Sequence, residues 1–361
     1  MTSGNASSAK VWVRFYRVKC LPMRAVALLT LSVILSLSIL TSLSAADERT
    51  LAEAVRAATE MPRLHSLIVS RRGQVLVERY FNGARAARPA NIKSASKSFI
   101  SALVGIAIDR KLLGGVRQPI GPFFPELAAP SEAPKRAITI EDLLTMRAGL
   151  ETTSNRNYGA WVQSRNWVRF VLTRDLIERP GVQMEYSTGS THLLSAILTK
   201  ASGTSTWQFA QDAPARPLGF SLAPWTRDPQ GIYFGGNEMV MTPKQMLAFG
   251  ELYRNKGRLG AKQIIPESWT RESLRPRTRS PRNDQGYGYG WWSREFAGYE
   301  TFFAWGYGGQ YIFIVPELDV VVVTTSSTAV GEERRSHRRT IFDLLEQLIL
   351  PAVAQMDADT N

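Results

Sequence analysis

Ser94 and Lys97 are the residues whose types and spacing most clearly permit chemistry. They stand three residues apart at the start of an apolar helical pattern over residues 91–115, so the helical period places both on one side of the first turn. A serine hydroxyl held against a lysine amine, at the positive end of a buried helix, is a way to make a nucleophile. The same spacing recurs at Ser7 and Lys10, where no site is expected, so an ordinary N-cap serine is the alternative for Ser94.

Two later stretches could complete a site around this pair. Tyr186 lies in a loop that follows Pro180 and Gly181 and directly precedes a helical pattern. Residues 305–310 form the glycine-dense run Trp-Gly-Tyr-Gly-Gly-Gln, which opens a strand. Taken alone, the tyrosine would be a half-buried core residue and the glycine run a turn. Together with Ser94 they offer a second acid–base group and a strand backbone that a substrate can approach closely.

The elements that must position these residues follow a simple order. Strand patterns cover residues 66–70, 74–81, 287–292, 301–305, 311–315 and 320–325, with hairpin turns at 71–73 and 316–319. Helical patterns cover residues 48–58, 139–149, 161–177, 190–201, 242–252 and 340–350, besides the stretch that carries Ser94. Strands therefore lie at both ends and helices between them. This order predicts an α+β fold, with one antiparallel sheet built from both chain ends, flanked by terminal helices, and an inserted helical subdomain.

Composition excludes several classes of protein. The 361 residues carry a net charge of +13; five basic and no acidic residues precede residue 47, which leaves 39 basic and 31 acidic residues and +8. The remaining positive charge gathers in two runs without interleaved aromatic residues, so we expect solvated surface and no nucleic-acid partner; the runs are Arg275, Arg277, Arg279 and Arg282, and Arg334, Arg335, Arg338 and Arg339. The only cysteine is Cys20, and the three histidines lack metal-binding spacing, so we expect no metal and no cofactor. Among them, His192 is expected to be a polar surface or capping residue.

Residues 1–46 indicate an export signal or an N-terminal anchor. Basic residues precede an apolar run over residues 25–40, and Ser44-Ala45-Ala46 gives a small-x-small cleavage pattern. Met23 is an alternative start with ordinary signal-peptide proportions. The run is close to spanning length, so an uncleaved anchor is the alternative. We therefore expect a periplasmic or secreted protein that meets the membrane only through an uncleaved N-terminal segment.

Five phrases in order resemble the serine β-lactamase and penicillin-binding-protein superfamily, most nearly its class C β-lactamase-like branch, which includes esterases and 6-aminohexanoate-dimer hydrolases. They cover most of the chain after residue 46 and lie at residues 94–99, 140–150, 228–231, 287–292 and 306–310. The resemblance implies a β-lactamase-like fold and one serine hydrolase domain over residues 47–361.

The resemblance also implies roles. Ser94 would attack an ester or amide carbonyl and form an acyl-enzyme. Its proton would pass either to Lys97, if burial lowers the pKa of that amine, or to Tyr186 acting as a phenolate-like shuttle. The implied oxyanion hole consists of the Ser94 N–H and one N–H on the strand after Gly308, with Gly309 as the expected donor.

Other positions bear on the substrate. Tyr158, Trp161 and Trp305 are candidates to line the pocket, with core packing as the alternative. Gly306 stands where β-lactamases and peptidases of the superfamily have Lys or His, and Thr188 replaces the Asn of their Tyr-x-Asn motif. Both departures favour small-molecule esters or linear amides over β-lactams and peptides.

Three alternatives stay open. The chain could be a true β-lactamase or D-amino-acid peptidase of the same fold, or a catalytically silent exported binding module. An α/β-hydrolase is disfavoured because the chain has no Gly-x-Ser-x-Gly and no repeating strand–helix pattern. The sequence predicts neither the natural substrate nor the oligomeric state.

Overall fold

The computed structural model describes residues 51–331 and 333–358. Residues 47–361 form one compact unit. The predicted export signal or anchor over residues 1–46 lies outside the described residues. Within the described ones, no helix combines the length and the apolar character needed to cross a membrane.

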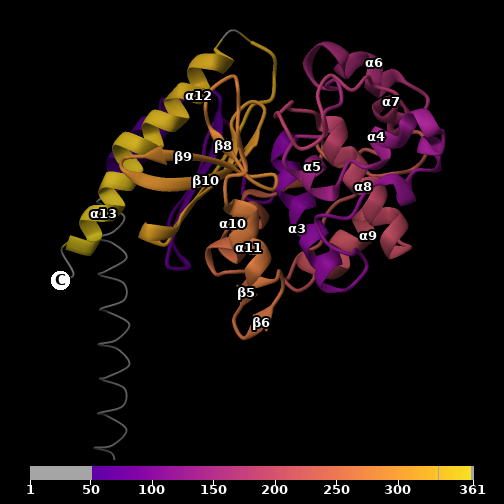
Figure 1. Ribbon diagram of the computed structural model, residues 1–361. Helices are drawn as coiled ribbons and strands as arrows, with labels where there is room; N and C mark the ends of the chain where they lie inside the picture. Colours follow the sequence, from indigo (N-terminus) through magenta and orange to yellow (C-terminus); the bar gives the residue numbers. More distant parts are fainter. Residues whose placement is uncertain (1–50, 332, 359–361) are drawn as a thin grey trace, which may run out of the picture. The chain divides into compact units, whose positions relative to one another are not determined.

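An eight-stranded antiparallel sheet forms the centre of the fold (Figure 1), in the order β2-β1-β12-β11-β10-β9-β8-β7. Its strands are β1 Leu64–Arg71, β2 Gln74–Tyr80, β7 Thr278–Arg279, β8 Gly286–Tyr287, β9 Trp292–Phe296, β10 Tyr299–Gly306, β11 Gln310–Val315 and β12 Val320–Ser326. Because β1 pairs with β12, the two ends of the domain meet in one sheet. This confirms the predicted α+β architecture.

The hairpin turns form where the sequence places residues that tolerate a positive φ. Arg72 and Gly73 have φ values of 50° and 82° between β1 and β2, and Asp319 has 53° between β11 and β12. The turn between β10 and β11 contains Gly308 and Gly309, with φ values of 91° and 114°, where a side chain would be strained. These glycines fix the end of β10.

Alternation along the strands divides the sheet into two buried faces. Tyr311 and Phe313 of β11 point to one core, and Ile312 and Ile314 point to the other. The first face is covered by helices from the two chain ends: α2 Ala52–Thr59, α12 Arg334–Asp343, η8 Leu344–Ile349 and α13 Leu350–Ala358. Figure 1 shows α12 and α13 lying along the sheet. The second face is covered by α10 Pro243–Arg254.

The helical subdomain lies between β2 and β7 in sequence and beside the sheet in space (Figure 1). Its centre is α3 Ser96–Asp109, which packs against α8 Thr188–Ser202. The other α-helices between these strands are α4 Ala133–Arg136, α5 Ile140–Leu144, α6 Tyr158–Gln163, α7 Trp167–Leu172, α9 Thr206–Ala210 and α11 Glu267–Leu274. Twelve consecutive residues of α3, from Ser96 to Ala107, are buried, so this helix is enclosed on all sides.

Three of the predicted elements are wrong in extent. The single helix over residues 161–177 is two helices, because Asn166 caps α7 by accepting a hydrogen bond from the Arg169 N–H. The single strand over residues 287–292 is split into β8 and β9 by a turn in which Gly290 has a φ of 78°. The closing helix also begins earlier and ends later than residues 340–350.

Candidate active site

Ser94 lies in a 3-10 turn, η1 Lys93–Ala95, that leads directly into α3. The preceding Lys93 has a φ of 51°, an uncommon conformation for a long side chain and one that is enriched at functional sites. Two hydrogen bonds hold it: the Lys93 N–H donates to Asn91 Oδ1 at 3.0 Å, and Ser96 Oγ donates to the Lys93 carbonyl at 2.5 Å. The turn keeps Ser94 partly exposed while the helix behind it is buried.

Lys97 is fully enclosed, with 1% of its surface exposed. Its Nζ lies 2.6 Å from the Gly236 carbonyl oxygen, 3.1 Å from Ser94 Oγ and 3.4 Å from Thr188 Oγ1. No carboxylate in the described part of the chain pairs with it, and burial lowers the pKa of Lys97 to about 7. A neutral amine can donate its two N–H groups to Gly236 and Thr188 and use its lone pair to accept from the Ser94 hydroxyl.

Tyr186 also forms a hydrogen bond with the Ser94 hydroxyl, but burial shifts its pKa in the opposite direction from that of Lys97. Burial raises the pKa of Tyr186 to about 12, and its hydrogen bond with Ser94 offsets only part of that effect. The Lys97 amine lies 5.0 Å from the centroid of its ring. The ring stacks on Trp292 at 5.8 Å, which fixes its plane. At neutral pH the phenol keeps its proton while a large fraction of Lys97 has lost one.

Thr188 is the first residue of α8, and its position depends on a serine that sequence reasoning missed. Ser154 Oγ lies 2.9 Å from Thr188 Oγ1 and accepts from the Thr188 N–H at 2.9 Å. Thr153 and Ser187 form a parallel contact at 3.1 Å between their hydroxyls. The hydroxyl-rich run Thr-Thr-Ser at residues 152–154 is the only sequence feature that could have indicated these contacts, and it meets α8 only in the folded protein.

Gly236, also missed, supplies the carbonyl that accepts the closest Lys97 contact. A Cβ at Gly235 would collide with the Thr191 carbonyl oxygen, and one at Gly236 with Thr191 Oγ1. The absence of both side chains lets this segment lie against α8 and aim the Gly236 carbonyl at the amine.

His192 corrects a prediction. Instead of lying at the surface, His192 is 0% exposed, and its Nε2 lies 3.1 Å from Asp228 Oδ2, also fully buried. The Gly235 N–H donates to His192 Nδ1 at 3.5 Å. The prediction failed because the partner of His192, Asp228, lies 36 residues away in sequence, and a local helical pattern does not reveal such a contact. The pair packs against the segment that carries Gly236.

The end of β10 forms the other side of the site. A Cβ at Gly306 would collide with the carbonyl oxygen of Ile92, two residues before Ser94, so any side chain at this position would require the backbone to shift. Gly308 lies close to the segment that follows β12, since a Cβ there would be 2.6 Å from the Ser327 carbonyl oxygen. The Gly309 N–H donates to the Gly306 carbonyl at 3.3 Å, so the expected oxyanion donor already has a long hydrogen bond.

The predicted pocket aromatics differ in position. Tyr158 is partly exposed, and its hydroxyl accepts from Asn237 Nδ2 at 3.0 Å, next to Gly236. Trp305 is also partly exposed, with Trp292 at 5.6 Å and the Arg338 guanidinium over its ring at 5.4 Å. Trp161 is 0% exposed and belongs to the core. The first two flank the Ser94 region, and Trp161 does not line a pocket.

The sheet, the buried Ser-x-x-Lys helix and the tyrosine loop together define a β-lactamase-like hydrolase fold. Residues 51–346 match the Beta-lactamase family, and the chain belongs to that family. This confirms the resemblance inferred from the five sequence phrases. The family is generally hydrolytic. No relative among curated proteins is detected by sequence.

Solved structures agree with this assignment. EstCE1, a hydrolase with promiscuous acyltransferase activity, has a TM-score of 0.68 and 19% identity over 83% of this chain and 99% of that one. A Bacillus anthracis protein provisionally named 6-aminohexanoate-dimer hydrolase has a TM-score of 0.64 and 22% identity over 80% and 81%. A penicillin-binding protein from Bacillus halodurans has 0.64 and 14% over 81% and 99%. At these identities the likeness establishes the fold alone, and the activity has to be inferred from the residues of the site.

Proposed function

We propose that this protein is a serine hydrolase that forms an acyl-enzyme at Ser94 and cleaves a carboxylic ester or a linear amide. The observation that carries the proposal is the buried Lys97 amine, 3.1 Å from Ser94 Oγ, whose close partners are neutral oxygens. Burying a lysine without a counter-ion costs folding free energy. If Ser94 only capped the helix, it would not need a buried lysine beside it. A nucleophilic serine does need one, because the lysine serves as its general base.

The first half of the reaction transfers the acyl group. Neutral Lys97 accepts the Ser94 proton as Oγ attacks the carbonyl carbon, and the carbonyl oxygen gains the negative charge. The Ser94 N–H lies in a first helical turn, where amides lack intrahelical partners, and it is one donor to that oxyanion. The second donor comes from the β10–β11 hairpin, with Gly309 as the candidate. When the C–O or C–N bond breaks, the departing oxygen or nitrogen takes a proton from Tyr186, which is regenerated from the Lys97 ammonium.

The second half returns the free enzyme. Water attacks the acyl carbon, loses its proton to the neutral Lys97, and the ester bond to Ser94 breaks as Oγ is reprotonated. The products are a carboxylic acid and an alcohol or amine. We assign the proton acceptor to Lys97 rather than Tyr186, because a pKa of about 7 suits a base at neutral pH and a pKa of about 12 does not.

The proposed substrates are esters and linear amides rather than β-lactams. A β-lactam or peptide carboxylate needs a cation beside the nucleophile, and Gly306 supplies none in a place where the Ile92 carbonyl leaves no room for a Cβ without a backbone shift. The aromatic rings of Tyr158 and Trp305 are suited to an apolar acyl chain or leaving group.

A fluorophosphonate probe tests the nucleophile. The full-length protein and a Ser98→Ala variant are expected to be labelled, because the Ser98 hydroxyl donates to the Gly290 carbonyl at 2.6 Å and takes no part in the site. The Ser94→Ala variant is expected to remain unlabelled. Equal labelling of both variants, or none of the wild type, would show that Ser94 is not the nucleophile and would favour a silent binding module.

A substrate panel then tests the substrate class. Short p-nitrophenyl esters and linear p-nitroanilides are expected to be turned over by the wild type, and nitrocefin only slowly. Nitrocefin turnover faster than ester turnover would instead identify a β-lactamase.

A further inference from the structure

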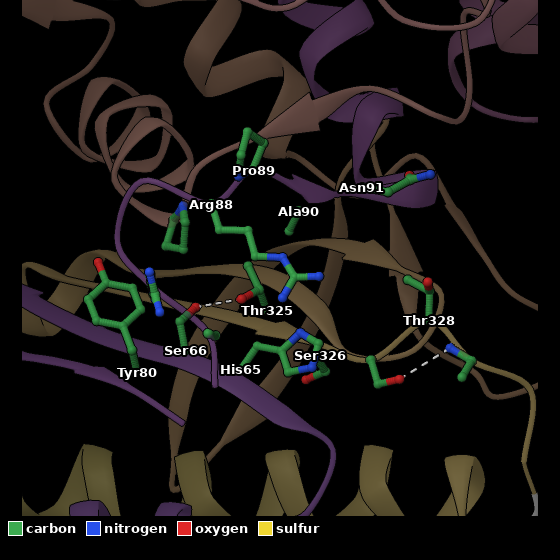
Figure 2. A pocket seen from close by; sticks show the side chains of 15 residues that line it. His65, Ser66, Tyr80, Arg88, Pro89, Ala90, Asn91, Thr325, Ser326 and Thr328 are labelled. Carbon is green, nitrogen blue, oxygen red and sulfur yellow. Dashed lines mark hydrogen bonds between the residues drawn. The ribbon is translucent and has the colours of Figure 1, made fainter. Parts of the chain in front are cut away.

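A cavity of about 410 Å³ lies at the ends of β1 and β12, under the loop of residues 82–91 (Figure 2). Ser94, Lys97 and Tyr186 do not line it. Its volume is in the range of small-molecule binding sites. The lining residues nearest in sequence to the nucleophile are Pro89, Ala90 and Asn91, and the Asn91 amide donates to Glu238 Oε2 at 2.5 Å. The cavity adjoins the catalytic turn, since Asn91 Oδ1 accepts from the Lys93 N–H, but the catalytic residues themselves do not line it.

Two arginines supply the charge of this cavity. Arg85 and Arg88 both line it, and neither guanidinium forms a hydrogen bond or ion pair within residues 51–331 and 333–358. In Figure 2 the Arg88 side chain extends from the loop toward Thr325, Ser326 and His65.

The acids near the cavity cannot neutralise these arginines. None of the described residues that line it is Asp or Glu. Glu78, which accepts from the lining Tyr80 at 2.8 Å, is paired with Lys244 at 3.1 Å. Glu238 is occupied by Asn91 and by Lys93 at 2.8 Å. The cavity thus keeps a net positive potential.

Neutral hydrogen-bonding groups surround the two cations. Ser66 and Thr325 share a hydrogen bond of 2.6 Å, and the side chains of Ser327 and Thr328 lie beyond them on the same wall. Burial, Arg88 and Arg63 lower the pKa of His65, so its imidazole is neutral at pH 7 and can accept or donate. Guanidinium and hydroxyl groups are the donors that carboxylate and phosphate oxygens bind in proteins.

We propose that this cavity is a second binding site, which takes a small molecule through a carboxylate or phosphate group bound between Arg85 and Arg88. The oxygens of the anion accept from the two guanidinium groups and from the hydroxyl of Thr328, which lines the same cavity. Anion binding at this cavity does not require turnover at Ser94, so it can be measured apart from the hydrolytic reaction.

Isothermal titration calorimetry of the full-length Ser94→Ala protein, at low ionic strength, tests the proposal without turnover. Inorganic phosphate and succinate are the probes. A dissociation constant of about 1 mM or tighter is expected for one or both, and the double variant Arg85→Gln/Arg88→Gln should weaken it about tenfold or more, as for loss of charged hydrogen bonds. The matched control is Arg169→Gln, an exposed, unpaired arginine on α7, which should leave binding unchanged.

The two probes distinguish the ligand class, since tighter binding of phosphate points to a phosphorylated ligand and tighter binding of succinate to a carboxylic acid. The chain has three histidines, so imidazole NMR signals can locate the bound anion. The His65 signals should shift with the anion, while those of buried His192 should not. Absence of binding up to about 10 mM of both anions would overturn the proposal. Equal binding by the double variant and the Arg169 control, or an unshifted His65, would do the same.

Discussion

A carboxylate placed next to Lys97 should raise the pH at which the enzyme becomes active. Thr188 is the position for it, because its Oγ1 lies 3.4 Å from Nζ and the residue is 4% exposed. As the first residue of α8, it lies where an aspartate is favoured by the helix dipole. Thr188→Asp and Thr188→Asn have nearly the same shape and differ in charge, so the pair isolates the electrostatic effect.

The size of the shift follows from the burial of the amine. Burial lowers the pKa of Lys97 from 10.5 to about 7. Since the neutral form is the base, kcat/KM of the wild type should rise tenfold per pH unit up to about pH 7 and then level off. A carboxylate about 4 Å away stabilises the ammonium form by about 4 kcal/mol at an effective dielectric constant of about 20, or roughly 3 pKa units. The Thr188→Asp profile should therefore still be rising at about pH 9.5, with about 500-fold lower activity at pH 7.

The assay is kcat/KM for p-nitrophenyl butyrate from about pH 5 to about pH 9.5, with subtraction of spontaneous hydrolysis. The Thr188→Asn variant should keep its midpoint near pH 7, because a neutral amide does not favour the ammonium. Coincident profiles for the two variants would refute the assignment of Lys97 as the base. A wild-type midpoint above about pH 9 would show that burial does not lower the pKa of this amine.

Three further changes test the same site. Tyr186→Phe should lower kcat/KM by about 100-fold or more without moving the pH midpoint, because Lys97 is unchanged. Lys97→Met should abolish ester hydrolysis yet increase the free energy of unfolding at pH 6 by on the order of 4 kcal/mol, with little gain near pH 10.5, measured in urea. The sign follows because the lowered pKa makes the ammonium unfavourable only in the folded state, so wild-type stability falls as pH drops from 10.5 to about 7. Gly306→Ala should lower stability by about 1–3 kcal/mol, because its Cβ meets the Ile92 carbonyl.

Each of these has a contradicting outcome. A shifted midpoint in Tyr186→Phe would mean that the phenol titrates in the working pH range. A stability gain in Lys97→Met that is the same at both pH values would come from packing rather than from the buried charge. Unchanged stability in Gly306→Ala would show that the strand end can move away from Ile92, and the same protein should then be tried with Gly306→Lys and nitrocefin.

Much of the sheet and its hairpins could be predicted from the sequence, because strands and turns depend on local residue patterns. Period-2 alternation located the strands near the chain ends, and turn residues such as Asp319 located their hairpins. The local signals failed where a polar residue interrupts an apolar run. Asn166 ends one helix and caps another inside a stretch that reads as continuous, since either outcome satisfies the same hydrophobic pattern.

The sequence by itself determined the order of the candidate residues, the family and the pairing of Ser94 with Lys97, since a three-residue spacing on a helix fixes their proximity. Only the tertiary structure decided what that pair can do. The Gly236 carbonyl, the Ser154 hydroxyl and the buried His192–Asp228 pair reach the site from distant segments. The same packing excludes water from Lys97, and the resulting fall in its pKa makes the lysine amine a candidate base. Because the desolvation of Lys97 depends on every segment that packs around it, no local pattern of residues predicts it.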